Sequence, residues 1–309
     1  MEYVIESHSL CKRYRKHEVL KDLNIHIPKG SVYGLIGRNG AGKTTFMRII
    51  CGIQIPTSGD FTVFGVSGRD REIARVRKRM GAVVETPALC YEMSARDNLK
   101  QQNCYLGIPD DTGIDELLEL VGLSGTGRKK AGDFSLGMKQ RLGLAMALAG
   151  DPDIIILDEP VNGLDPEGII EIRETILKLN REKCITFVIS SHILDELSRI
   201  ATHYGFIDDG HIVEEISAEG IARKCRKAFT IETDSADILS SILEQRGQTY
   251  EIGTGGEVII YGDIDVSSIT RELLGKGGDI KSISQTNESL ESYYLNLIGN
   301  KADGGSGND

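Results

Sequence analysis

The chain has 309 residues, of which 40% are hydrophobic and 27% are charged. This composition is too apolar for a disordered chain, and the length suggests two domains, or one large domain with an appendage. Lysine and arginine number 36 against 46 aspartate and glutamate residues, which gives a net charge of −10. That balance argues against a protein that wraps nucleic acid by neutralising its phosphates.

Two further features bear on the cellular compartment. No apolar run approaches the ~18 residues needed to cross a bilayer, and the N-terminal segment lacks the apolar core of a secretory signal. The six cysteines are scattered and form no Cys-x-x-Cys pair. This pattern is typical of reduced thiols in a cytosolic protein, rather than of a disulfide framework or a zinc site.

Short apolar segments alternate with helical patterns through residue 226. We expect strands at 31–36, 82–85, 154–158 and 185–190, and helices at 43–51, 166–180 and 193–200. The unbroken apolar run at 154–158 is typical of a central parallel strand that is covered on both faces. The alternation predicts a doubly wound α/β domain. Residues of about 88–150 differ, because helical patterns at 94–106, 113–121 and 135–149 have no convincing strand among them, so we interpret them as a helical insertion.

The charge balance changes near residue 226. Residues 227–309 contain 6 basic and 14 acidic residues, whereas the first 226 contain 30 and 32. This change suggests a domain boundary, although a well-solvated acidic domain explains the charge by itself. Strand patterns at 229–233, 249–252, 258–261 and 280–284, with helical patterns at 236–245, 267–274 and 290–298, predict a small α+β domain over 227–299 in the order β-α-β-β-α-β. The glycine-rich end, 300–309, is predicted to be a disordered tail.

Residues 37–44 read GRNGAGKT and fit the phosphate-loop pattern G-x-x-x-x-G-K-[S/T]. The loop follows a predicted strand and precedes a predicted helix, which is the context that this chemistry needs. Glycines let backbone N–H groups approach phosphate oxygens, and the helix N-terminus adds partial positive charge. Lysine neutralises the β- and γ-phosphates, and the threonine hydroxyl ligates Mg²⁺. The predicted nucleotide-binding residues are Gly37, Arg38, Asn39, Gly40, Ala41, Gly42, Lys43, Thr44 and Thr45.

Two carboxylates, Asp158 and Glu159, end the apolar run at 154–158. Carboxylates in such a position are costly unless a metal or a ligand uses them. We expect Asp158 to hold Mg²⁺, directly or through water, and Glu159 to polarise the water that attacks the γ-phosphate.

Residues 133–141 read DFSLGMKQR and resemble the signature sequence of ATP-binding-cassette (ABC) ATPases, whose common form is Leu-Ser-Gly-Gly-Gln. Residues 162–165 (NGLD) resemble the D-loop of that family, and His192 resembles its switch histidine. Tyr14 looks like the aromatic residue that stacks on adenine. These motifs occur in the family's order across about residues 3–225, so the chain is identified as an ABC-transporter ATPase subunit.

The resemblance implies a fold: a P-loop NTPase of ABC type over residues 1–226, with a mixed sheet core and a helical subdomain at about 88–150. It implies ATP and Mg²⁺ as cofactors. Ser135 and Gly137 would form an anion site that faces the γ-phosphate of ATP on a second ATPase subunit, in a head-to-tail dimer. His192 would contact the γ-phosphate. An integral-membrane permease would be the other partner, and the chain would be cytoplasmic, peripheral on the inner face of the membrane.

The sequence also departs from the family pattern. Leu136 and Met138 replace the first glycine and the glutamine of the signature, and Glu85 stands where the family has the Q-loop glutamine. These departures resemble the bacitracin- and lantibiotic-resistance branch of bacterial ABC exporters. We expect Glu85 to lie in the Mg²⁺ shell or one water away from the metal. The alternative is that Glu85 points to solvent and pairs with a nearby base.

Two other functions remain open at this point. A soluble ABC ATPase that acts on nucleic acid or ribosomes is disfavoured by the single cassette and the acidic balance. An ATP-binding regulator without hydrolysis is disfavoured by the presence of both Glu159 and His192. Export, powered by MgATP hydrolysis and passing through a separate permease that selects the cargo, is the leading prediction.

Overall fold

The structure is a computed structural model that describes residues 2–109, 111–224, 228–253, 256–262, 264–286 and 290–302. It divides into two compact units, Met1–Ala218 and Glu219–Asp309, and each is treated by itself. The expected boundary at residue 226 lies on the C-terminal side of this division. Within the described ranges, no helix has both the length and the apolar character that a membrane crossing requires.

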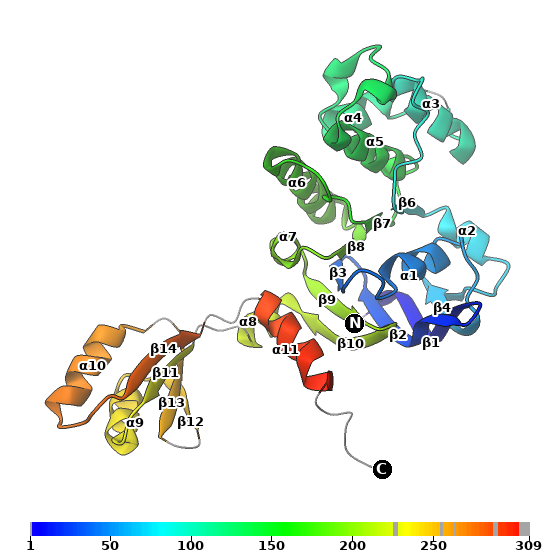
Figure 1. Cartoon of the computed structure of the whole chain (residues 1–309). Coiled ribbons are helices and arrows are strands. Elements are labelled where there is room, and N and C mark those ends of the chain that lie inside the picture. Colours follow the sequence, from blue (N-terminus) through cyan, green and yellow to red (C-terminus); the bar gives the residue numbers. More distant parts are fainter. Residues whose placement is uncertain are drawn as a thin grey trace. The chain divides into compact units, whose positions relative to one another are not determined.

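A six-stranded sheet forms the centre of the first unit, with the strand order β10-β9-β3-β8-β7-β6 (Figure 1). All neighbouring strands in it are parallel except β9 and β10, which are antiparallel. The strands are β3 (Val32–Ile36), β6 (Met80–Val83), β7 (Ile154–Asp158), β8 (Thr186–Ser191), β9 (His203–Asp208) and β10 (His211–Ser217). The four strands expected from apolar runs are confirmed; 154–158 has the expected bounds, and the bounds of the other three shift by one or two residues.

A second sheet, with the order β2-β1-β4-β5, is entirely antiparallel. Its strands are β1 (Tyr3–Tyr14), β2 (His17–Pro28), β4 (Ser58–Val63) and β5 (Val66–Ser67). The sequence analysis made no prediction here. Several register shifts interrupt the pairing of β1 with β2, so the apolar residues do not keep the strict alternation that identifies a strand. Together the two sheets confirm the mixed-sheet core of an ABC-type P-loop NTPase.

Helices on the sheets and a separate helical group complete this unit (Figure 1). They are α1 (Lys43–Ile50), α2 (Ile73–Arg77), α3 (Ala95–Leu106), α4 (Ile114–Leu120), α5 (Leu136–Leu148), α6 (Pro166–Lys183) and α7 (Leu194–Ser198), and α8 (Ala218–Lys224) follows at the division. The group α3–α5 has its own apolar core, which includes Leu99, Leu118, Phe134 and Leu142. Helix α3 begins where the Ser94 side chain accepts a hydrogen bond from the Asp97 backbone N–H, as a serine N-cap should.

The second unit has the element order β-α-β-β-α-β, followed by a last helix. Its antiparallel sheet has the strand order β12-β13-β11-β14. The elements are β11 (Ala228–Glu232), α9 (Ala236–Gln245), β12 (Thr249–Ile252), β13 (Glu257–Tyr261), α10 (Val266–Gly275), β14 (Ser282–Thr286) and α11 (Leu290–Ala302). Ile231, Val258 and Ile260 of the sheet are buried with residues of α9 and α10 in one core. Residues 300–302 of the predicted tail belong to α11, and 303–309 lie outside the described residues.

Candidate nucleotide site

The phosphate loop joins β3 to α1. Lys43 is the first residue of α1, and its side chain is only 6% exposed because it folds back beneath the loop. Its Nζ donates a hydrogen bond of 2.6 Å to the carbonyl oxygen of Gly37. The backbone N–H groups at the start of the helix have no intrahelical acceptor, so the loop presents donors and a buried cation at one place.

Two glycines of the loop are required by its close packing. A Cβ on Gly37 would lie 2.4 Å from the carbonyl oxygen of Ile207 in β9. Gly42 has φ 110°, a left-handed value, and a Cβ there would lie 2.6 Å from Cδ2 of the buried Leu20. Any larger residue at either position would displace the loop from the strands behind it.

The carboxylate of Asp158 is buried at the end of β7, with 3% exposure. Its Oδ2 accepts a hydrogen bond of 2.8 Å from the Thr44 hydroxyl, and its Oδ1 accepts one of 2.5 Å from the Ser190 hydroxyl. Among the described residues, no group of three or more histidine, cysteine, aspartate or glutamate side chains could hold a metal ion. An ion with oxygen ligands that takes one carboxylate, one hydroxyl, ligand phosphates and water fits this pair, and Mg²⁺ has those preferences.

Glu159 lies between a lysine and a histidine. Its Oε1 is 3.6 Å from Lys43 Nζ, and its Oε2 is 2.6 Å from His192 Nδ1. Its backbone has φ 51°, and its N–H donates a hydrogen bond of 2.9 Å to the Ser190 hydroxyl, which holds the turn. A left-handed conformation is unusual for glutamate, and such strain concentrates at functional sites.

A pocket of about 340 Å³ lies over these groups. It brings together nine predicted site residues and two others. Its lining is Val19, Arg38, Asn39, Gly40, Gly42, Lys43, Thr44, Thr45, Glu159, Asn162 and His192. Asn162 belongs to the D-loop motif, but the sequence analysis gave it no role. Val19 lies in β2 and no sequence signal points to it. Asp158 and Gly37 do not line the pocket, but each accepts a hydrogen bond from a residue that does. Asp158 accepts one from Thr44, and the carbonyl oxygen of Gly37 accepts one from Lys43.

Five other predicted site residues are not in the lining of this pocket, and one of them, Ala41 of the phosphate loop, is buried. The carboxylate of Glu85 is 56% exposed and forms an ion pair with Arg48. The hydrogen bond that the Arg48 guanidinium donates to this carboxylate raises the pKa of the guanidinium. The Tyr14 hydroxyl donates to the side chain of Gln54, and the Lys12 ammonium lies 5.1 Å from the centre of the Tyr14 ring.

The remaining two, Ser135 and Gly137, lie at the start of α5. The Ser135 hydroxyl accepts a hydrogen bond of 3.2 Å from the backbone N–H of Met138 and so caps the helix. Ser135 is exposed, so its hydroxyl and the helix N-terminus face solvent.

Comparison with known proteins identifies the family of the chain. The family model for the ABC transporter matches residues 20–162. The chain is 39% identical to the bacitracin transport ATP-binding protein BcrA of Enterococcus faecalis over 97% of both chains. It is 43% identical to the lantibiotic transport ATP-binding protein SrtF of Streptococcus pyogenes, over 70% of this chain and 92% of that protein.

Solved structures agree in fold. An ATP-binding cassette in a dimeric post-hydrolysis state, bound to ADP and phosphate, matches with a TM-score of 0.64 and 24% identity, and covers 69% of this chain and 98% of that one. The family model and the identity to BcrA show that the chain belongs to the ABC transporter family. It is an ATP-binding, ATP-hydrolysing subunit of an ABC transporter.

Proposed function

We propose that the chain hydrolyses MgATP to power the export of peptide antibiotics, or related compounds, through a separate integral-membrane permease. The proposal rests on the site in which Glu159 lies between Lys43 and His192. The names of two relatives, which concern bacitracin and lantibiotic transport, support the choice of cargo.

Each side chain of the site has a role in this reaction. Backbone N–H groups of the phosphate loop and Lys43 hold the β- and γ-phosphates. Thr44 and Asp158 would hold Mg²⁺, which, when bound, offsets the charge of the phosphates. Glu159 accepts a proton from the attacking water, and His192, hydrogen-bonded to Glu159, holds the carboxylate in place and contacts the γ-phosphate.

Glu85 and Tyr14 do not line the pocket, but each has a role in the reaction. Tyr14, 39% exposed, stacks on adenine. Glu85 reaches the Mg²⁺ shell when its carboxylate leaves Arg48. The charge of Asp158 also raises the pKa of the Arg48 guanidinium, which indicates that Arg48 lies near the carboxylate that would hold the metal.

A second copy of the chain completes the site in a head-to-tail dimer. Ser135 and Gly137 do not line the pocket of their own chain, and the N-terminus of α5 is exposed, as an anion site for the partner's ATP requires. The permease contact lies in the segment after Glu85, where Tyr91 and Met93 are 52% and 38% exposed. Leu89, in the same segment, packs against the core of α3–α5 instead. Through this contact the chain would lie at the cytoplasmic face of the membrane.

The dimer is tested with the Glu159→Gln variant of the full chain. Since the variant binds MgATP without hydrolysing it, we expect gel filtration with light scattering to show a dimer with MgATP and a monomer without it. A monomer at saturating MgATP would contradict the head-to-tail site. Purification from membranes tests the other partner: an integral-membrane protein should be retained with the chain, whereas ribosomes in its place would support the nucleic-acid alternative.

A further inference from the structure

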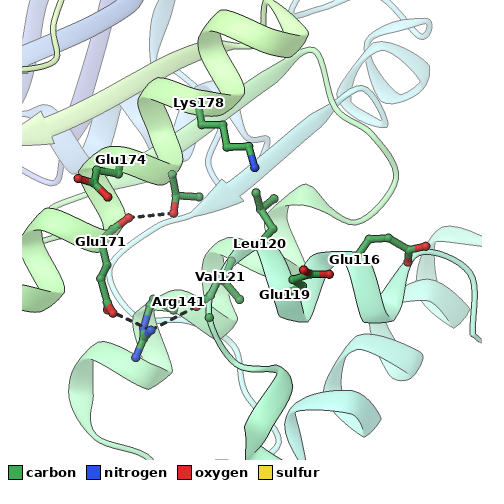
Figure 2. Close-up of a pocket in the computed structure, with 10 residues that line it drawn as sticks. Glu116, Glu119, Leu120, Val121, Arg141, Glu171, Glu174 and Lys178 are labelled. Atoms are coloured by element: carbon green, nitrogen blue, oxygen red, sulfur yellow. Dashed lines mark hydrogen bonds and ion pairs between the residues drawn. The ribbon is translucent and has the colours of Figure 1, made fainter.

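Arg141 links three helices of the first unit. It lies in the second turn of α5, the helix that begins with the signature sequence. Its Nη1 is 3.0 Å from Oε2 of Glu171 in α6 and donates a hydrogen bond of 3.3 Å to the carbonyl oxygen of Val121, at the end of α4 (Figure 2). The Arg141 side chain is 19% exposed, so the guanidinium is held largely out of water, where its charge interactions are screened less.

The surroundings of this ion pair are otherwise loosely packed. A pocket of about 690 Å³ lies beside it, with walls from α4 and α6 (Figure 2). Glu116 and Glu119 stand on the α4 wall, and Glu174 and Lys178 stand on the α6 wall. Within the described structure, none of these four side chains forms an ion pair. The Arg141 guanidinium therefore supplies a link between the helical group and α6 that these walls do not supply.

The N-terminal ends of α5 and α6 are in contact as well. Gly163, in the D-loop before α6, has φ 75°, and a Cβ there would lie 2.9 Å from Cδ2 of Leu136. A Cβ on Gly137 would lie 3.6 Å from Cδ2 of Leu164. Leu136, the residue that replaces a signature glycine, thus packs over the D-loop of its own chain.

The two contacts occur at equivalent positions along α5 and α6, counted from the start of each helix. Leu136 is the first residue of α5 and Arg141 its sixth; α6 begins at Pro166, directly after the D-loop, and Glu171 is its sixth residue. One contact therefore joins the helix starts, and one ion pair joins their second turns.

We infer that Arg141 is a positioning residue for hydrolysis, which acts with Glu171 to hold the signature helix against the D-loop helix. The contact sets where Ser135 and Gly137 lie when they meet the ATP of a partner subunit. This inference rests on the proposed head-to-tail dimer. Arg141 does not line the nucleotide pocket of its own chain.

The experiment measures ATP-driven dimerisation of the full chain in the Glu159→Gln background. Adding Arg141→Gln should raise the dimer dissociation constant about tenfold, within the range measured for coupled residues. The affinity of the monomer for ATP should not change, because the phosphate loop is untouched. The charge-swapped variant, Arg141→Glu with Glu171→Arg, should recover most of the loss.

The matched control is Arg173→Gln. Arg173 is also an arginine of similar exposure, 20%, and pairs with Glu196 at 3.6 Å, but it joins α6 to α7 and not to the signature helix. It should leave dimerisation unchanged.

The outcomes separate the two proposals. If Glu159→Gln alone stays monomeric with MgATP, the dimer itself is wrong. If Glu159→Gln dimerises and Arg141→Gln does not weaken the dimer, the positioning role is wrong. Equal losses in the Arg141 and Arg173 variants would also overturn it, since any ion pair of α6 would then have the same effect. If Arg141→Gln unfolds at the assay temperature, the charge-swapped variant provides the test. A charge-swapped variant that is folded but still dimerises weakly would contradict the inference.

Discussion

The imidazole Nδ1 of His192 lies 2.6 Å from Oε2 of Glu159, although the two residues follow different strands. Glu159 follows β7 and His192 follows β8, and these neighbouring parallel strands end at the same edge of the sheet. The contact holds the Glu159 carboxylate beside the phosphate loop, where Lys43 approaches its other oxygen.

The Glu159→Gln substitution should lower the ATP turnover number by at least about 100-fold, the scale of general acid–base catalysis. The amide keeps the size of the side chain but cannot take a proton from water. Nucleotide affinity should stay close to that of the unchanged protein, because Glu159 acts mainly in the transition state. Steady-state hydrolysis and equilibrium nucleotide binding measure the two effects. Turnover near that of the unchanged protein would remove Glu159 from this role.

Gly42→Ala should abolish nucleotide binding and destabilise the protein by about 3 kcal/mol, from a left-handed φ and overpacking together. Gly40→Ala is the matched control: its φ is 85°, yet a Cβ there would meet nothing within 4 Å. Gly40→Ala should lower the free energy of unfolding by about 1 kcal/mol, the cost of the left-handed backbone alone. Urea unfolding of both variants gives the difference in the free energy of unfolding. Equal losses would mean that Leu20 and Val19 move aside without cost.

Glu85→Gln should preserve nucleotide binding while it reduces the dependence of ATP affinity on Mg²⁺. A carboxylate near the triphosphate repels it unless the metal offsets the charge, and like charges ~4 Å apart cost about 4 kcal/mol at an effective dielectric of 20. ATP titrations with and without Mg²⁺ compare the two proteins. An identical Mg²⁺ dependence would leave Glu85 as the surface partner of Arg48, which is its position in the structure.

Cys51 should remain a neutral thiol in the folded protein well above neutral pH. Desolvation by burial raises its pKa from 9.0 to about 12. Since the folded-state pKa lies above that of the unfolded chain, the stability from this group is complete below pH 9 and is lost as the pH rises toward 12. Alkylation at pH 8 should therefore modify the exposed Cys104 and Cys184 before Cys51. Mass spectrometry of the labelled peptides measures the order, and rapid labelling of Cys51 would contradict it.

Contiguous motifs allowed much of the fold to be predicted from the amino-acid sequence. The phosphate loop and β7 depend on residues that are near neighbours in the chain, so periodicity and glycine placement identify them. The three helices of the helical group and the element order of the second unit were also predicted in this way. The β1–β2 pair was not, because its register shifts remove the alternation on which a strand prediction depends.

Contacts between distant residues depended on the tertiary structure. The sequence pattern singles out Glu85 but gives no signal for Arg48, and only the packing of α1 beside the end of β6 makes them an ion pair. Val19 enters the nucleotide pocket because β2 passes behind the phosphate loop. The sequence alone predicted which residues bind phosphate, since phosphate binding needs a local run of glycines, lysine and threonine. The tertiary structure decided which side chains meet, because strand order and helix packing join residues whose separation along the chain is more than a hundred positions, as for Thr44 and Asp158.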